Sequence, residues 1–128
     1  MASVFELMKI TSKISKMTDS FNRNLADLKS AAAAADADTF FKCYSEAAGL
    51  CEKIYDTAEN AALYAGSESA ERMLKDLQND KTGLLNTLID CAAESGKHDV
   101  LHALSETYRA EMTEESLQHL QEVLTSAQ

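Results

Sequence analysis

The feature that most constrains this chain is a single stripe of apolar residues near its start. Successive members lie three or four residues apart, at Leu7, Ile10, Ile14, Met17, Phe21, Leu25 and Leu28. That spacing places all of them on one side of a helix, which is the seam pattern of coiled coils and helical bundles. A helix with such a seam is unstable alone, so the rest of the chain must supply helices that cover it.

The composition predicts helix almost throughout. The 128 residues include no Pro and only four Gly, and aromatic residues are few. Strands favour β-branched and aromatic residues, and turns favour Gly and Pro, so this composition argues against a sheet. A chain of this length can bury one core, and we expect residues 1–128 to form a single helical domain.

The apolar spacing and the turn residues predict an all-α fold, a four- to five-helix antiparallel bundle. A long N-terminal helix is expected over residues 3–34, with Ser3 as its N-cap. A central helix is expected over residues 39–65, because its broad apolar face suits packing on more than one side. Gly66 is expected to end that helix in a left-handed conformation.

Residues 67–95 carry one apolar stripe, interrupted by a turn-rich segment at residues 79–83. The segment is therefore open to interpretation as one helix or two, capped by Ser67 or Ser69. Apolar residues keep the same helical phase across the interruption, which favours one helix with a weak point at Gly83.

The last third of the chain is expected to contain two shorter helices. Gly96 should stop the preceding helix, and the next should span residues 98–112. Thr113 should then cap a final helix over residues 114–126, whose first turn carries acidic residues suited to the positive end of the helix dipole.

The charge of the chain is negative and unevenly distributed. The net charge is -9, whereas residues 1–35 carry five Lys or Arg against three Asp or Glu. Phosphates would be repelled by the acidic remainder, and no basic patch with interleaved aromatic residues occurs. The charge therefore argues against direct binding of nucleic acid or of an anionic membrane, and it permits a basic protein partner.

The three cysteines indicate a reducing compartment. Cys43 and Cys51 lie eight residues apart on one expected helix, or about 12 Å along its axis, which is too far for a disulfide inside an intact helix. With Cys91 they sit among apolar neighbours and are expected to be buried and inert. No apolar run long enough for a membrane span or a signal peptide occurs, so we expect a cytoplasmic protein.

Motifs that carry chemistry are few. His98 and His102 lie four residues apart on an expected helix, a spacing at which two imidazoles can share a metal, yet no further ligands accompany them. No nucleophile elbow, Gly-rich phosphate loop or HExxH motif occurs. We therefore expect no enzyme activity, no metal and no cofactor.

The favoured function is that of an acidic, non-enzymatic binding protein, an adaptor or chaperone-like module that holds a helical or basic segment of another protein. Two groups of residues are the candidates for partner binding. The first comprises apolar residues away from the seam, and the second comprises acidic residues of the central helix: Val4, Phe5, Met8, Glu46, Glu52, Asp56 and Glu59.

Two alternatives remain open from the sequence. One is a self-associating structural protein, a homo-oligomer in which the N-terminal helix, residues 4–28, forms the subunit contact. The other is an inhibitor whose acidic surface occupies a nucleic-acid-binding site on a basic protein. The first should depend little on salt, and the second should weaken as salt rises.

Overall fold

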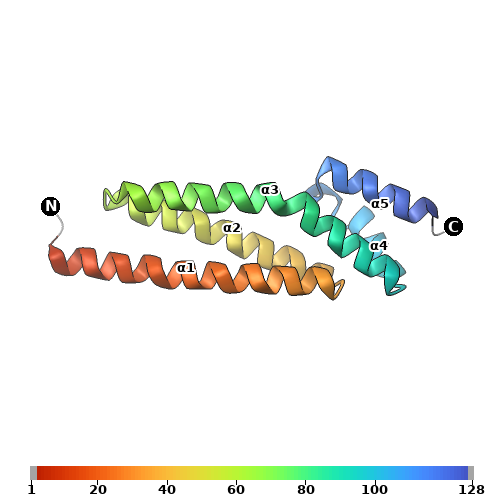
Figure 1. Ribbon diagram of the computed structural model, residues 1–128, viewed down its shortest axis with the longest axis horizontal. Helices are drawn as coiled ribbons and strands as arrows, with labels where there is room; N and C mark the ends of the chain where they lie inside the picture. Colours follow the sequence, from red (N-terminus) through yellow and green to blue (C-terminus); the bar gives the residue numbers. More distant parts are fainter. Residues whose placement is uncertain (1–2, 127–128) are drawn as a thin grey trace. The chain divides into compact units, whose positions relative to one another are not determined.

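The computed structural model describes residues 3–126, and it confirms the all-α helical bundle (Figure 1). Within those residues the chain forms five α-helices, one short 3-10 helix and no strand. In chain order the elements are α1 (Val4–Ala33), α2 (Ala37–Asn60), α3 (Tyr64–Glu94), α4 (His98–Ser105), η1 (Arg109–Glu111) and α5 (Glu114–Ser126).

Polar side chains cap the starts of three helices. Ser3 and Glu6 form a reciprocal capping box, in which the Glu6 amide donates to Ser3 Oγ at 3.1 Å and the Ser3 amide donates to Glu6 Oε2 at 3.4 Å. Asp36 accepts from the Thr39 amide at 3.2 Å at the start of α2. Thr113 accepts from the Ser116 amide at 3.2 Å at the start of α5. The expected caps at Ser3 and Thr113 are therefore confirmed.

The three long helices all end in the same hydrogen-bonded turn, with one residue in the left-handed region. That residue is Ala35 (φ 55°) after α1, Ala62 (φ 57°) after α2 and Gly96 (φ 69°) after α3. In the second turn the Ala62 amide donates to the carbonyl of Glu59 at 3.1 Å, and the Leu63 amide donates to that of Ala58 at 2.8 Å. These are the two bonds of the Schellman motif, which satisfies carbonyls at a helix end.

The expectation that Gly66 ends the central helix is wrong. α2 ends at Asn60, and Gly66 lies in the first turn of α3. Its role is close packing, because a Cβ at Gly66 would lie only 3.1 Å from the Cβ of Ala58. Alanine is the best helix former, so the alanines on both sides of this turn conceal it in the sequence. The expected caps at Ser67 and Ser69 are wrong for the same reason, because both residues lie inside α3.

The segment left open as one helix or two is one helix. α3 runs without a break through Gly83, whose carbonyl accepts from Thr87 Oγ1 at 3.0 Å.

The next helix is shorter than expected. α4 ends at Ser105 instead of residue 112, and a 3-10 turn occupies Arg109–Glu111. None of the helices in the described range is long and apolar enough to cross a membrane.

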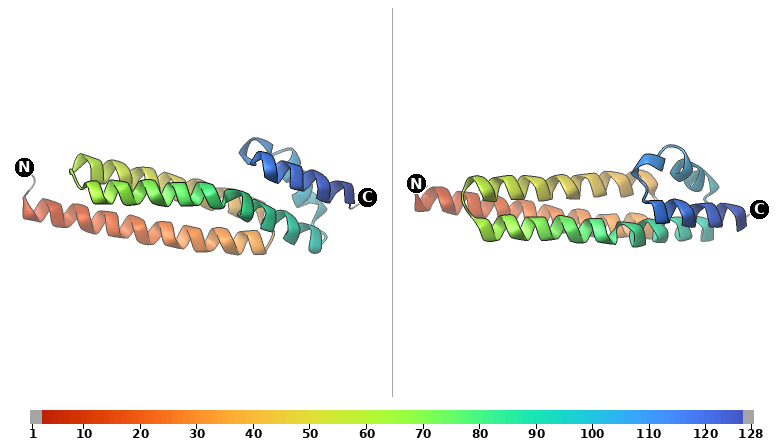
Figure 2. Two further views of the ribbon diagram at one scale, coloured as in Figure 1. Left: turned by 45° about the horizontal axis from the view of Figure 1, so that its top comes forward. Right: turned by 90° about the horizontal axis from the view of Figure 1, so that it is seen from above.

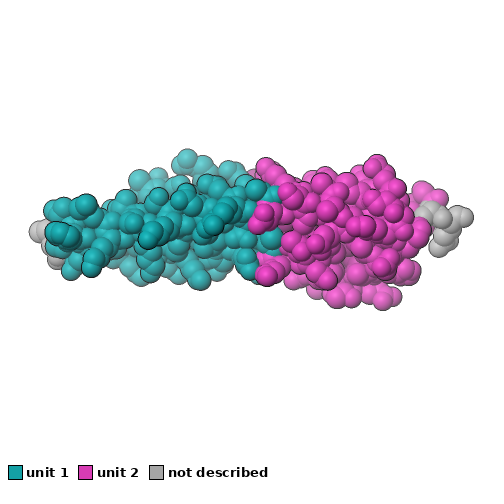
Figure 3. All heavy atoms as spheres, turned by 90° about the horizontal axis from the view of Figure 1, so that it is seen from below, with its two compact units in different colours: residues 1–26, 43–78 teal, residues 27–42, 79–128 magenta. Residues whose placement is uncertain are grey.

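The chain forms two compact units, each of which draws on α1, α2 and α3 (Figure 3). Unit 1 comprises residues 1–26 and 43–78, and unit 2 comprises residues 27–42 and 79–128. The single-domain organisation expected from the sequence stays a prediction.

Unit 1 is a bundle of three helical segments, in which α2 and α3 lie side by side and α1 packs along them (Figures 1 and 2). α1 has 30 residues and α2 has 24, and the first turns of α1 extend past the α2–α3 turn (Figure 1). The seam is only half-buried from Leu7 to Met17 and is buried at Phe21.

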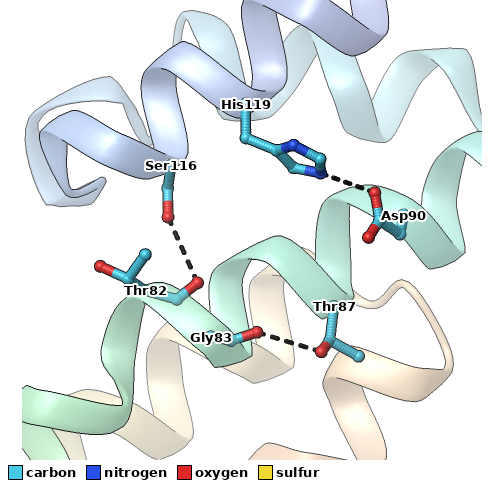
Figure 4. A network of polar contacts seen from close by, with 6 residues as sticks. All are labelled: Thr82, Gly83, Thr87, Asp90, Ser116 and His119. Carbon is cyan, nitrogen blue, oxygen red and sulfur yellow. Dashed lines mark hydrogen bonds and ion pairs between the residues drawn. The ribbon is translucent and has the colours of Figure 1, made fainter.

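Unit 2 has a core of large aliphatic and aromatic side chains, including Leu28, Phe40, Leu88 and Leu104, none of which exposes more than 1% of its surface. Polar contacts fasten α5 to α3 in this unit (Figure 4). Ser116 Oγ donates to the carbonyl of Thr82 at 3.4 Å, and His119 Nε2 lies 2.7 Å from Asp90 Oδ1. Around α4, the ring of Tyr108 stacks on Phe41 at a centroid distance of 4.3 Å and donates its hydroxyl hydrogen to Asp38.

Replacing Ala62 by Gly should raise the free energy of unfolding by about 0.5–1 kcal/mol. The left-handed conformation costs an L-residue about 1–2 kcal/mol and costs glycine almost nothing, although the freedom of glycine in the unfolded chain offsets part of the gain. Ala26→Gly, an exposed site inside α1, should instead lower stability by about 1 kcal/mol. Urea unfolding followed by circular dichroism measures both changes, and a lowered midpoint for Ala62→Gly would contradict the assignment of this turn.

Candidate partner-binding groove

A groove lies between α2 and α3 within unit 1, with a cavity of about 350 Å³. Cavities that hold ligands or side chains of a partner begin at roughly this size. Its lining combines apolar and acidic residues from both helices and includes no Lys, Arg or His: Cys51, Glu52, Tyr55, Asp56, Ala70, Glu71 and Leu74. We call this the α2–α3 groove.

The floor of the α2–α3 groove is apolar and combines small with large side chains. Cys51 on α2 and Ala70 on α3 are each only 1% exposed. Tyr55 follows Cys51 by one helical turn, and Leu74 follows Ala70 by one turn, so each helix contributes one small and one large residue to the floor. Both large residues are half-buried, which leaves part of their apolar surface available for contact.

The rim of the groove carries three exposed carboxylates. Glu52 and Asp56 lie one helical turn apart on α2, and Glu71 lies on α3. Tyr55 on α2 and Glu71 on α3 line the same groove, so a ring and a carboxylate from opposite helices meet in it. The groove thus has an apolar floor with negative charge on both rims. This surface is complementary to a cationic amphipathic helix, whose apolar face would contact the floor and whose basic residues would lie at the rims.

The pKa of Tyr55 reports the negative potential at this site. It is raised above its usual value of 10, chiefly by the nearby carboxylate of Glu59 and then by burial. The charges of Glu71 and Asp56 act in the same direction. A negative phenolate is disfavoured beside these carboxylates, and a cation at the same place would be favoured.

The structure brings together two of the seven residues predicted from the sequence. Glu52 and Asp56 both line the groove. Glu46 and Glu59 are exposed on α2 and outside the lining, although the charge of Glu59 acts on Tyr55. The three apolar candidates lie on α1 and are also outside the lining: Val4, Phe5 and Met8.

Sequence reasoning missed the half of the groove that α3 contributes. Ala70, Glu71 and Leu74 reach the groove only because the chain turns at residues 61–63 and α3 starts at Tyr64. The sequence-based prediction placed the turn at Gly66. It therefore gave a wrong register of α3 relative to α2, and the α3 residues that face α2 could not be identified. By its spacing, Tyr55 falls in the apolar stripe of α2, and periodicity cannot show that part of its ring is open to a groove.

A second exposed feature is the α1 tip, which we define as Val4, Phe5 and Met8. Their side chains are 75%, 77% and 65% exposed. The capping box at Ser3 and Glu6 keeps this first turn helical, so it does not fold back onto the bundle. Single exposed apolar residues are ordinary on protein surfaces, but three large ones within five residues form a patch.

The histidine pair does not assemble a metal site in the part of the chain that the structure describes. His98 and His102 are both exposed on α4. No group of three or more His, Cys, Asp or Glu residues is placed to hold a metal ion among residues 3–126.

Comparison with protein-family models, with curated proteins and with solved structures yields no match for this chain. The chemistry of the α2–α3 groove and of the α1 tip is therefore the basis for a functional proposal.

The three cysteines should differ sharply in reactivity toward iodoacetamide at about pH 8. Burial raises the pKa of the Cys51 thiol from its usual 9 to about 11, so this thiol stays protonated and shielded. Cys43 is also buried, whereas Cys91 is half-buried and should be alkylated first. Peptide mass spectrometry gives the order, and all three should react in urea. Alkylation of Cys51 as fast as Cys91 in the folded protein would contradict the closed packing of the groove floor.

Proposed function

We propose that this chain is a non-enzymatic binding protein, adaptor or chaperone-like, that holds a basic amphipathic helix of a partner protein in the α2–α3 groove. The observation that carries the proposal is the combination of an apolar floor with carboxylates on both rims. A third helix lying along two others buries its apolar face and leaves its basic side chains at the carboxylates.

The charge of the whole chain supports a cationic partner. A net charge of -9 raises the local concentration of cations and accelerates their association with an acidic groove. A catalytic role is less well supported by the same residues. The only thiol in the lining is Cys51, which is buried with a raised pKa, and no histidine lies beside it in the groove to act as a base.

A fluorescent helical peptide of about 18 residues, with Leu on one face and Arg and Lys on the other, tests this proposal. The full chain should bind it, and the double substitution Glu52→Gln and Asp56→Asn should weaken binding about threefold to tenfold, because each exposed ion pair contributes up to about 1 kcal/mol. Raising NaCl from about 0.05 M to about 0.5 M should weaken binding to the native chain more than to the double variant.

The matched control removes two carboxylates outside the groove, with Glu94→Gln and Glu106→Gln, both at exposed sites in unit 2. This control has the same net charge as the groove variant and should bind the peptide nearly as well as the native chain. Equal losses in the two variants would show that only overall charge matters, and the α2–α3 groove would then not be the binding site.

A second candidate function is self-association, and the α1 tip favours it. The tip exposes three large apolar side chains on a helix that extends past its neighbours in unit 1 (Figure 1). Two copies that paired their α1 tips would bury this patch together with the half-buried start of the seam.

Light scattering at two protein concentrations and two salt levels tests the self-association candidate. An oligomer should form that dissociates when Phe5 and Met8 are both replaced by Ser, and salt should affect it little because the contact is apolar. Replacing Tyr64 by Ser serves as the control, because Tyr64 is 61% exposed and lies outside the tip. A monomer of 14.0 kDa under every condition would exclude this candidate.

A further inference from the structure

We infer that the α2–α3 groove selects arginine over lysine in the segment that it holds. This inference rests on the proposed function and specifies the side chain that the groove recognises. Two features carry it: an aromatic ring in the lining, and carboxylates from both helices in the same lining.

Tyr55 is the central residue of this arrangement. On α2 it lies three residues after Glu52 and directly before Asp56, and all three line the groove. Glu71, on the opposite helix, contributes a further carboxylate to the same lining. The side chain is half-buried, so part of the ring remains open to an incoming group.

Arginine and lysine differ in how they use such a site. The guanidinium group is planar, so it can stack on the face of an aromatic ring while its edge donates two parallel hydrogen bonds to a carboxylate. The lysine ammonium is a compact and strongly hydrated charge that pairs with a carboxylate and presents no flat surface to a ring. A ring flanked by carboxylates therefore stabilises arginine through both contacts and lysine chiefly through one.

The composition of the lining adds to this selectivity. The seven residues of the groove include no cation that would occupy the carboxylates. The apolar floor formed by Cys51, Ala70 and Leu74 receives the methylene chain of either side chain equally. The contacts of the stem are the same for both residues, so discrimination depends on the head group and on the ring of Tyr55.

The experiment compares two helical peptides of about 18 residues that are identical except that every cationic position is Arg in one and Lys in the other. Fluorescence anisotropy measures the Kd of each for the full chain. The arginine peptide should bind about tenfold more tightly. Tyr55→Phe keeps the ring and should keep this ratio, whereas Tyr55→Leu removes the ring and should reduce the ratio to less than about threefold.

Two further variants complete the design. Tyr64→Leu removes an exposed tyrosine that does not line the groove, and it should leave the ratio unchanged. If Tyr55→Leu loses helical circular dichroism, Glu71→Gln takes its place. This exposed substitution removes one rim carboxylate and should weaken binding of the arginine peptide more than that of the lysine peptide.

The outcomes separate this inference from the proposed function. Equal Kd values for the two peptides in the native chain would overturn arginine selection and leave the binding function intact. A preference for arginine that survives both Tyr55→Leu and Glu71→Gln would also overturn the inference, because the selectivity would then lie elsewhere. Failure of both peptides to bind the native chain at low salt would overturn the proposed function itself.

Discussion

Close packing of small side chains between α2 and α3 in unit 1 determines whether a groove can exist there. Near the turn, Gly66 approaches Ala58 so closely that an added methyl group would lie 3.1 Å from the Ala58 Cβ, a tighter contact than is usual. One to two turns further along, Cys51 and Ala70 are almost fully buried in the floor of the groove. Small residues bring the two backbones together, and the longer side chains of Tyr55 and Leu74 then project beside a shallow cavity. Larger residues at the small positions would fill this space or separate the helices.

Charge then decides what kind of surface the groove presents. Residues 43–78 of unit 1 contain seven Asp or Glu and three Lys or Arg, whereas residues 1–26 contain four Lys or Arg and two Asp or Glu. The acidic segment, residues 43–78, supplies all three rim carboxylates of the groove. Because the rim residues are exposed, their interaction with a cation is modest and salt-sensitive, and the apolar floor must provide the remaining binding energy.

Local sequence signals were reliable where they act within one or two helical turns. The seam of α1, the caps at Ser3 and Thr113 and the stop at Gly96 follow from periodicity and from short-range hydrogen bonds. The unbroken α3 follows from helical phase that persists through Gly83. The turn at Ala62 was missed because alanine favours helix on both sides of it, and only the Schellman bonds to Glu59 and Ala58 reveal the break.

By itself, the sequence determined that this chain is helical, that it is acidic after its first helix, and that Glu52 and Asp56 share one face of α2. Those properties depend on composition and on spacing along a single helix, which the order of residues states directly. Only the tertiary structure decided that Glu71, Ala70 and Leu74 of α3 line the same groove as these two residues and Tyr55. Pairing of two helices depends on where the turn between them lies and on which side chains are small enough to meet. The periodic pattern within each helix does not specify the register of α3 relative to α2.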